Sequence, residues 1–485
     1  MGIVLKQSFT NTLILFLGFA IGGINVLFIY THFLHEDYYG LNTFLLSTAN
    51  ILSPLMVLGM QHTIIKFFTS FHTKYEQDQF LTSALVMPLF IIIPLGFIGA
   101  FTYESIANWL SVENAIIKPY TYLIFFTAIF IGYFEVFYSF SKVQYQSVFG
   151  NFVKEMFARI CATILLFAVH FKWITNEQFI YAIAIVYGLR MLIMMIYAFS
   201  LYKPDFIFKL PKNSREILSY SFYIILAGSA SGILLDIDKF MIPQLEQIAE
   251  VAYYAVGIYI ASVIAIPSRA MQQIINPLTA KELNNNNLKE VLSLYKKSSI
   301  TLLVAGGLLF LLINLNIQDL YAFINKPEYA VGGMIVLMIS ISEMYKLALG
   351  TNGAILTNSD HYRVFFYFSI AMALSVIFLN KWLIGVLGID GAALATLIVV
   401  LIFSTIKIIY IQVKMNMQPF TKKTIAILAV ILVLFFAFYF IELPFHALVN
   451  MIIKSIVVTL IYTFTVYKFR ISDDVNGLIN KYIQR

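Results

Sequence analysis

The apolar residues of this chain are gathered into long segments, and the gaps between them alternate between basic and nearly free of basic residues. Hydropathy divides the chain into fourteen apolar stretches, each long enough for a helix of about 20 residues to cross a bilayer. The predicted spans are 9–30, 41–60, 80–102, 119–140, 151–171, 178–202, 218–241, 251–274, 291–315, 330–350, 363–380, 391–411, 424–441 and 447–469. Because lipid cannot satisfy free backbone amides, each span is expected to be an α-helix. The sequence therefore predicts an all-α polytopic membrane protein with 14 transmembrane helices.

The basic residues indicate how the chain is oriented. Of the 32 Lys and Arg residues, 26 fall on the side of the membrane that holds both termini. The other six are Lys118, Lys172, Lys239, Lys326 and Lys381 in the opposite gaps, and Lys454 inside the last span. Cytoplasmic loops carry an excess of Lys and Arg, so both termini are expected in the cytoplasm. The predicted location is the cytoplasmic (inner) membrane.

Composition narrows the possible partners. Apolar residues make up 60% of the chain, charged residues only 12%, and the net charge is +7. The basic residues are scattered over many inner loops, so anionic membrane lipids explain them better than nucleic acid does. Cys161 is the single cysteine, which leaves no intrachain disulfide and no thiolate metal site.

An internal repeat relates the two halves of the predicted array. Gly18 and Gly22 in helix 1 correspond to Gly228 and Gly232 in helix 7, and Gly40 corresponds to Gly257 in the helices that follow. Helices 6 and 12 also correspond. Six helices per repeat is an even number, so the two halves keep the same orientation, as in secondary transporters whose halves rock about a central site. Glycines shared by chance are the alternative explanation.

The repeat defines the expected domains. An N-terminal six-helix lobe covers 1–202, a cytoplasmic linker covers 203–217, and a C-terminal six-helix lobe covers 218–412. Helices 13 and 14 with a cytoplasmic tail occupy 413–485. The two lobes are expected to be related by a pseudo-twofold axis and to enclose a cavity. The four glycines of helices 1 and 7 are expected where helices approach closely.

Short segments carry a resemblance to a known family. They hold Glu36, Asp37, Tyr39, Gly40, Leu58, Gly59 and Lys66 around helix 2, and Asp238, Gly257, Tyr259 and Pro277 around helices 7 and 8. These segments, with NGAILTNSDHYRVFFYFSI later in the chain, resemble oligosaccharide flippases of the MOP (multidrug/oligosaccharidyl-lipid/polysaccharide) superfamily. The resemblance extends over essentially the whole chain. It identifies the superfamily better than the cargo.

The resemblance implies a function in cell-surface polysaccharide biosynthesis, of the O-antigen flippase type in lipopolysaccharide synthesis. The implied cargo is an undecaprenyl-diphosphate-linked oligosaccharide, moved across the membrane by alternating access. A polysaccharide polymerase and glycosyltransferases of the same pathway are the implied partners. The family's lipid-diphosphate flippases place arginines in a central cavity, whereas helix 1 here has no basic residue beyond Lys6. Detailed cavity chemistry therefore does not transfer.

Two other functions stay open. A MATE-like cation-coupled drug or metabolite antiporter shares the two-lobe layout but usually has twelve helices and acidic cation sites, so helices 13 and 14 favour a lipid-linked cargo. A membrane-embedded polymerase or glycosyltransferase needs a large catalytic outer loop, and the outer gaps here are short. The chain has neither a P-loop nor an HExxH motif, so neither ATP hydrolysis nor a zinc-protease site is expected. No cofactor, metal or catalytic residue is predicted, and the protein is not expected to be an enzyme.

Arg190 is the clearest candidate for substrate binding. It lies deep within helix 6 among apolar neighbours, and an ionisable residue inside a span usually faces the protein interior or an aqueous cavity. Either it lines the cavity and meets an anionic substrate group, or it has a structural role, in which it pairs with a carboxylate that holds the bundle together or snorkels toward the inner surface.

Further charges within the spans are candidates for gating or ion coupling. Glu135 and Arg159 lie at a similar depth in successive helices and are expected to pair. Glu343 precedes Lys346 by three residues, and Asp236 precedes Lys239 by three, a spacing that places two side chains on one helix face. Local ion pairs are the plainer interpretation. Asp238 joins this second group, near the outer end of helix 7, where substrate release or cation coupling is the functional alternative.

Four more residues complete the predicted substrate site. Lys66 and Arg269 follow corresponding helices of the two halves at the inner side, where they would suit capture of a diphosphate, although the positive-inside bias alone would also place them there. Asn25 and Asn50 offer uncharged donors for a sugar. Hydrogen bonds between helices are the commoner use of such amides.

Overall fold

Every regular element in the part of the chain that the structure describes, residues 2–359 and 361–483, is a helix. The structure is a computed structural model. Two compact units divide the chain, the first ending at Ala252 and the second beginning at Tyr253. Each unit is described by itself below.

The first unit contains the helices that precede this boundary. They are α1 (Gly2–Ile24), η1 (Asn25–Ile29), α2 (Tyr30–Phe33), α3 (Glu36–Met56), α4 (Met60–Phe67), η2 (Phe68–Ser70), α5 (Lys74–Val86), α6 (Leu89–Phe101), α7 (Tyr103–Leu110), η3 (Ala115–Tyr120), α8 (Thr121–Val143), α9 (Val148–Phe152), η4 (Val153–Phe157), α10 (Ala158–His170), α11 (Asn176–Leu201), α12 (Ser214–Met241) and η5 (Ile242–Gln244). Helix α13 (Ile248–Ser262) carries the chain across the boundary.

The second unit contains the remaining helices. They are η6 (Val263–Ala265), α14 (Ile266–Asn284), α15 (Leu288–Asn314), α16 (Ile317–Ile324), η7 (Pro327–Gly332), α17 (Gly333–Ala348), α18 (Asn352–Asn358), α19 (Tyr362–Leu387), α20 (Ile389–Met415), α21 (Lys422–Tyr439), α22 (Ala447–Lys468) and α23 (Asp473–Ile483). Of the short elements, η1 and η4 are π-helical turns and the others are 3₁₀ turns.

Among the described residues, eleven helices are long and apolar enough to cross a membrane, or twelve if the bent pair α3–α4 counts as one span. These twelve correspond to twelve of the fourteen predicted spans. The predicted spans 151–171 and 218–241 fall on Val148–His170 and on α12, which are helical but are not among the twelve. The chain is therefore a multi-pass membrane protein, and the count of fourteen remains a prediction.

Helix α8 lies at the centre of the first unit and packs against α3, α4 and α11. Its Phe134 is fully buried, in a core that includes Phe80 and Met194. Gly132 lets α3 come close, because a Cβ there would lie 2.6 Å from Val57 Cγ1 and 3.0 Å from Ser53 O. Close contact of this kind is how helices associate in lipid, where hydrophobic burial contributes little between them.

A bend of 46° separates α3 from α4. Leu58 and Gly59 both have positive φ, 53° and 63°, a conformation that glycine adopts without strain. A Cβ on Gly59 would also lie 2.7 Å from Ile224 Cγ2 of α12. Below the bend, the Thr63 and Ser221 hydroxyls are hydrogen-bonded at 2.9 Å and buried. The bend therefore fits α4 against α12.

Asn114 fixes one end of the first unit. Its amide nitrogen donates to Pro243 O at 2.7 Å and to Glu246 O at 2.8 Å, and its amide oxygen accepts from the Ile248 backbone N–H at 2.8 Å. Gly40 lies against the same segment, since a Cβ on it would meet Ile248 O at 1.9 Å. A glycine is therefore required where α3 meets the start of α13.

The four glycines of predicted helices 1 and 7 were expected where helices approach closely. This prediction holds for only some of them. A Cβ on Gly18 would lie 2.8 Å from Glu155 O, so α1 approaches η4 closely there, and Gly22 is buried. Gly232 has no heavy atom of the described residues near its Cβ position, so the prediction is wrong at this residue. The packing of Gly228 lies outside the described residues.

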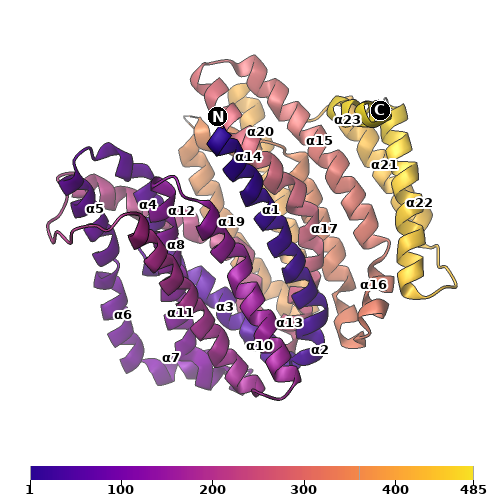
Figure 1. Cartoon of the computed structure of the whole chain (residues 1–485). Coiled ribbons are helices and arrows are strands. Elements are labelled where there is room, and N and C mark those ends of the chain that lie inside the picture. The colour runs from indigo at the N-terminus through magenta and orange to yellow at the C-terminus, as the bar shows by residue number, and fades with distance from the viewer. Residues whose placement is uncertain (1, 360, 484–485) are drawn as a thin grey trace. The chain divides into compact units, whose positions relative to one another are not determined.

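In the second unit, helix α15 is the element on which α17, α21 and α22 pack. A Cβ on Gly306 would meet Leu347 Cδ1 at 2.1 Å, and one on Gly307 would meet Ile431 Cδ1 at 2.4 Å and Tyr462 Oη at 2.8 Å. The paired glycines therefore admit α17 on one side and α21 and α22 on the other. Figure 1 shows α21 and α22 side by side, with α23 across their end at the C-terminus.

A hydrogen-bonded ion pair also joins α22 to α16. Lys454 Nζ lies 2.9 Å from Asp319 Oδ2, and Asn450 donates to Asp319 Oδ1 at 3.2 Å. Both charged side chains are largely buried, with 10% and 16% of their surfaces exposed. A cation inside the last span thus has a carboxylate partner from the neighbouring helix.

Candidate functional site: an intramembrane cationic cluster

Arg190 lies in the interior of the first unit, on the face of α11 that packs against α8. Only 7% of its surface is exposed. The guanidinium carbon lies 3.9 Å from the ring centroid of Phe134 and 5.5 Å from that of Tyr187. These stacking contacts hold a planar cation by attraction to the ring faces. They supply no negative charge.

No described residue forms an ion pair or a hydrogen bond with the Arg190 guanidinium, and its Nε is buried without a partner. Of the interpretations open for this residue, a structural ion pair is not present among the described residues. The substrate contact stays a prediction.

Glu135 of α8 forms its ion pair with Lys154, at 2.7 Å between Oε1 and Nζ. The predicted Glu135–Arg159 pair is therefore wrong. Arg159 instead bonds the carboxylate of Glu155, four residues earlier in its own helix, at 3.3 Å, and the Glu155 carbonyl at 2.9 Å. Lys154 lies within the π turn η4 and reaches Glu135 on α8, whereas Arg159 follows in α10.

Lys142, one turn below Tyr138 on α8, places its Nζ 3.8 Å from the Tyr138 ring centroid. Phe134, Tyr138 and Lys142 are spaced by four residues, so they follow one stripe of α8. Two cations, Arg190 and Lys142, thus lie on successive aromatic rings of one helix.

We call the following group the cationic cluster, because its members interact electrostatically with Glu135 or Arg190: Glu135, Lys142, Lys154, Glu155, Arg159 and Arg190. It contains four cations and two carboxylates, and both carboxylates already have cationic partners. The cluster therefore carries an excess of two positive charges. An excess of this kind is suited to an anionic ligand.

Asn25 has a structural position in the first unit. Its amide nitrogen donates to Arg159 O at 2.9 Å, and its amide oxygen accepts from the Thr163 hydroxyl at 2.8 Å. It is 3% exposed and lies in the π turn η1. The structure thus shows the helix–helix use of this amide. Asn50 is exposed on α3, and its side chain has no hydrogen bond to any described residue.

Lys66 and Arg269, the predicted diphosphate residues, are both exposed, each in its own unit. Lys66 Nζ lies 3.9 Å from the ring centroid of Tyr220 on α12. Arg269 follows Pro267 in the first turns of α14, and no carboxylate of the described residues lies within ion-pair distance.

Both predicted i,i+3 pairs are present. Lys239 Nζ lies 2.9 Å from Asp236 Oδ1, and Lys346 forms an ion pair with Glu343 on α17. Asp238 is buried, with 4% of its surface exposed. The plainer interpretation, a local ion pair, therefore holds for Glu343 and Asp236.

Sequence reasoning did not include Lys142, Lys154 and Glu155 in the site. Lys142 and Lys154 count there only among the basic residues of the inner side. A signal for two of them was present, since Lys154 and Glu155 fall inside the predicted span 151–171, where charges are costly and usually functional.

Solved structures identify the class of fold. The chain is similar to a structure described as the lipid II flippase MurJ in an inward closed conformation, with 15% identity and a TM-score of 0.72, over 95% of this chain and 99% of that one. It is also similar to an inward-facing MATE-family multidrug resistance transporter of the MOP superfamily, with 13% identity and a TM-score of 0.60, over 82% and 94%. A MOP-superfamily transporter from Pyrococcus furiosus matches at 11% identity and a TM-score of 0.52, over 85% and 96%. The chain therefore shares the fold of these transporters, as the resemblance predicts.

Sequence comparison then gives the family. The model of a family described as polysaccharide biosynthesis proteins matches residues 4–279. This is more than half of the chain, and the chain therefore belongs to this family. A search of curated protein sequences finds no match.

Proposed function

We propose that the protein is a flippase that moves an undecaprenyl-diphosphate-linked oligosaccharide from the inner to the outer leaflet of the cytoplasmic membrane for cell-surface polysaccharide synthesis. Its polysaccharide biosynthesis family and MOP fold support this assignment. The observation that carries it is Arg190, a buried arginine inside a membrane-spanning helix with no carboxylate partner among the described residues.

A diphosphate supplies what Arg190 lacks. An arginine at bilayer depth is costly unless a partner or water compensates it, and the guanidinium fork matches phosphate oxygens through two parallel hydrogen bonds. The remaining charge excess of the cationic cluster would match the second negative charge of the headgroup. We therefore assign the diphosphate to this cluster, with Lys66 and Arg269 as candidate first contacts at the inner surface.

The lipid tail requires no polar path. It stays in the bilayer while the headgroup crosses about 30 Å of hydrocarbon. Helices α21 and α22 pack on α15 at Gly307 and expose many apolar side chains, among them Phe436, Leu460 and Phe464. We propose that these two helices, predicted as 13 and 14, guide the tail.

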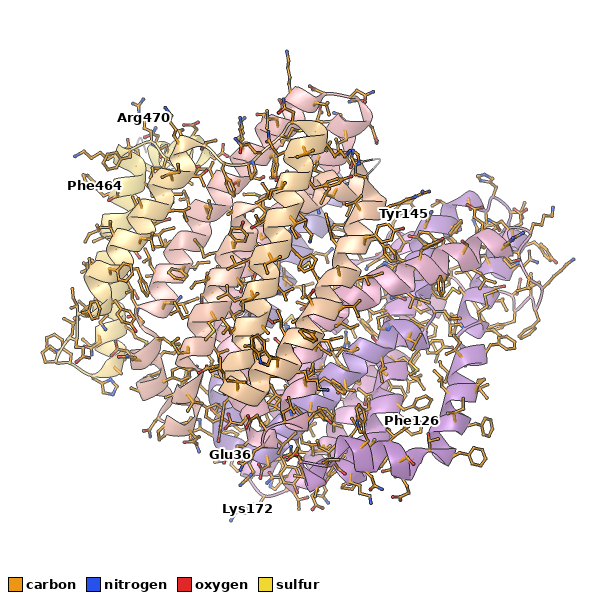
Figure 2. All side chains as sticks on the ribbon, turned by 180° about the vertical axis from the view of Figure 1, so that it is seen from behind. Glu36, Phe126, Tyr145, Lys172, Phe464 and Arg470 are labelled. Carbon is orange, nitrogen blue, oxygen red and sulfur yellow. The ribbon has the colours of Figure 1, made fainter. Side chains whose placement is uncertain are left out.

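The proposed topology has fourteen crossings and both termini in the cytoplasm. The two crossings beyond the twelve apolar spans would be Val148–His170 and α12, which is 28 residues long. In Figure 2, Tyr145 lies at one end of the first unit's helices, whereas Glu36 and Lys172 lie at the opposite end. The first end would face the cytoplasm, since the basic residues concentrate there. Alternating access would then involve the repeat lobes 1–202 and 218–412 and the linker 203–217.

An antiporter is the alternative, since MATE transporters share the fold. A site for an organic cation would need carboxylates without partners. In the cationic cluster both carboxylates are neutralised by Lys154 and Arg159. The charge balance therefore favours an anionic cargo.

Transport assays with purified protein separate these functions. Proteoliposomes would receive a fluorescent oligosaccharide on undecaprenyl diphosphate, the same oligosaccharide on a monophosphate, or a quaternary ammonium dye. We expect protein-dependent translocation of the diphosphate cargo and little of the other two. Dye exchange without lipid translocation would establish the antiporter instead.

Arg190 variants test the site within the same assay. Arg190→Ala is expected to abolish translocation while membrane abundance stays normal, and Arg190→Lys is expected to retain part of it, because a point charge attracts phosphate without the bidentate fork. Arg215→Ala, at an exposed position of α12, is the matched control. Normal translocation by Arg190→Ala would refute the proposed site.

A further inference from the structure

The second unit repeats the local arrangement that surrounds Arg190. In the first unit, α8 carries Glu135 and packs against α11, which carries Arg190. In the second unit, α17 carries Glu343 and packs against α20, which carries Lys407. Arg190 and Lys407 are separated by 217 residues, the same offset that relates Gly40 to Gly257 in the internal repeat.

In both units the glutamate forms its ion pair with a lysine that is not the cation of the partner helix. Lys154 pairs with Glu135, and Lys346 pairs with Glu343. The cation of the partner helix, Arg190 or Lys407, has no carboxylate within ion-pair distance among the described residues. Each helix pair therefore contains one neutralised glutamate and one uncompensated cation.

Lys407 lies inside the predicted span 391–411, about one helical turn before its end. It precedes the last residue of α20 by eight positions, about 12 Å at 1.5 Å per residue, and its side chain is partly buried. Its Nζ lies 3.6 Å from Met372 Sδ and 5.2 Å from the ring centroid of Phe365, both on α19. A thioether is a weak acceptor, so neither contact replaces an anion.

Its other electrostatic neighbour is also a cation. Lys346 interacts unfavourably with Lys407, and Glu343 alone cannot neutralise two lysines. By contrast, Lys454 of α22 has a carboxylate partner, because its Nζ lies 2.9 Å from Asp319 Oδ2. A buried or partly buried cation without a partner is costly in lipid, and an anionic ligand would remove that cost.

We infer that Lys407 is a second residue that binds the diphosphate headgroup of the cargo, the counterpart in the second unit of Arg190. The inference rests on the proposed flippase function. It lies outside residues 4–279, where the family model matches. The chemistry recognised is a phosphate ester in the membrane, which either a prenyl diphosphate or a bulk anionic phospholipid could supply. We assign the prenyl diphosphate, the headgroup that the proposed function assigns to Arg190, and the experiment below distinguishes it from bulk phospholipid.

Binding to the purified full-length protein tests the assignment. Farnesyl diphosphate would be titrated in detergent, with farnesyl monophosphate, phosphatidylglycerol and inorganic pyrophosphate as comparisons. Lys407→Met keeps the length and apolar packing of the side chain but removes its charge. We expect it to weaken farnesyl diphosphate binding by about tenfold, the effect of losing one charge-assisted hydrogen bond, and to reduce the preference over the monophosphate.

Two variants act as controls. Lys407→Arg is expected to restore binding, and Lys414→Ala, at an exposed position near the end of the same helix, is expected to bind as the wild type does. If Lys407→Met lost folded protein while Lys407→Arg retained it without binding, the charge would be structural and the inference would be overturned.

The outcomes separate this inference from the proposed function. Normal binding by Lys407→Met beside weakened binding by Arg190→Ala would overturn the role of Lys407 alone. Equal competition by phosphatidylglycerol would assign Lys407 to bulk lipid and overturn it as well. If the wild type neither bound farnesyl diphosphate nor translocated a lipid-linked oligosaccharide, both proposals would fail together.

Discussion

Lys154 Nζ lies 2.7 Å from Glu135 Oε1, and this ion pair leaves Arg190 of α11 without a carboxylate partner among the described residues. Glu135 is the carboxylate near enough to Arg190 to interact with it from the facing helix. Glu135 forms its ion pair with Lys154, and the Arg190 guanidinium stacks on Phe134 instead. The pair therefore determines which cation is available to a ligand.

Breaking the pair should destabilise the first unit. Glu135→Gln removes the charge that balances Lys154, whose side chain is 37% exposed. We expect a loss of about 1–2 kcal/mol in stability, at the lower end for a charged hydrogen bond because water reaches this lysine. The double variant Glu135→Gln with Lys154→Met should recover most of the loss. Melting temperatures in detergent micelles measure both effects.

The same single variant should change ligand affinity in the opposite direction. With Glu135 neutral, the cationic cluster would hold one more positive charge, so farnesyl diphosphate should bind more tightly at low ionic strength. Weaker binding by a well-folded Glu135→Gln protein would contradict the assignment of this cluster to an anion.

Alanine variants of Asn25 and Asn50 should show which of these two amides has a role in helix packing. Asn25→Ala removes two hydrogen bonds between η1 and α10, each worth about 0.6 kcal/mol on average within membranes. We expect a lower melting temperature and lower membrane abundance. Asn50→Ala changes an exposed amide with no described partner and should leave abundance unchanged. Quantitative immunoblots of membranes would show the contrast, and equal loss in both variants would contradict it.

Gly307 should be intolerant of a side chain. A Cβ there would lie 2.4 Å from Ile431 Cδ1 and 2.8 Å from Tyr462 Oη, so Gly307→Val should push α21 and α22 away from α15. We expect protease sensitivity in residues 413–485 and a lower melting temperature. Gly385→Ala, on α19 with no described heavy atom within 4 Å, is the control and should be tolerated.

Cysteine labelling can test the proposed topology directly. Cys161 is the single native cysteine, so a Cys161→Ala background gives a clean start. A membrane-impermeant maleimide should label cysteines introduced beside seven acidic residues of the predicted outer gaps: Glu36, Glu113, Glu177, Glu246, Glu328, Asp390 and Glu442. Cysteines introduced in place of Lys209 and Lys281 should react with the maleimide only in permeabilised cells. One outer site found inside would break the alternation.

The spans were the most predictable part of the fold. Hydropathy indicates directly whether a segment is suited to lipid or to water. Twelve predicted spans coincide with apolar helices. Val148–His170 is less clear because Lys154, Glu155 and Arg159 interrupt its apolar character. In α12 the side chains of residues 226–231 are outside those described, and charges lie at both ends of the helix.

The contacts of the site could be predicted from the sequence where the geometry of a single helix brings two side chains together. Asp236 with Lys239 and Glu343 with Lys346 are i,i+3 pairs, whose proximity needs no tertiary information. The partner of Glu135 depends on how two helices are rotated about their axes. Sequence depth placed Arg159 at the right height but could not give this rotation, so it missed Lys154.

The two π turns have a consequence for how the chain tolerates change. A π turn accommodates one residue more than a regular helical turn, and one residue corresponds to about 100° of rotation about the axis, since 3.6 residues complete a turn. In η4 this extra residue comes before α10, which begins at Ala158 and carries Arg159. Deleting one residue from 155 to 157 would therefore convert η4 to regular helix while rotating Lys154 relative to Arg159. Such a deletion would keep the helix intact and still turn Lys154 away from its partner Glu135 on α8.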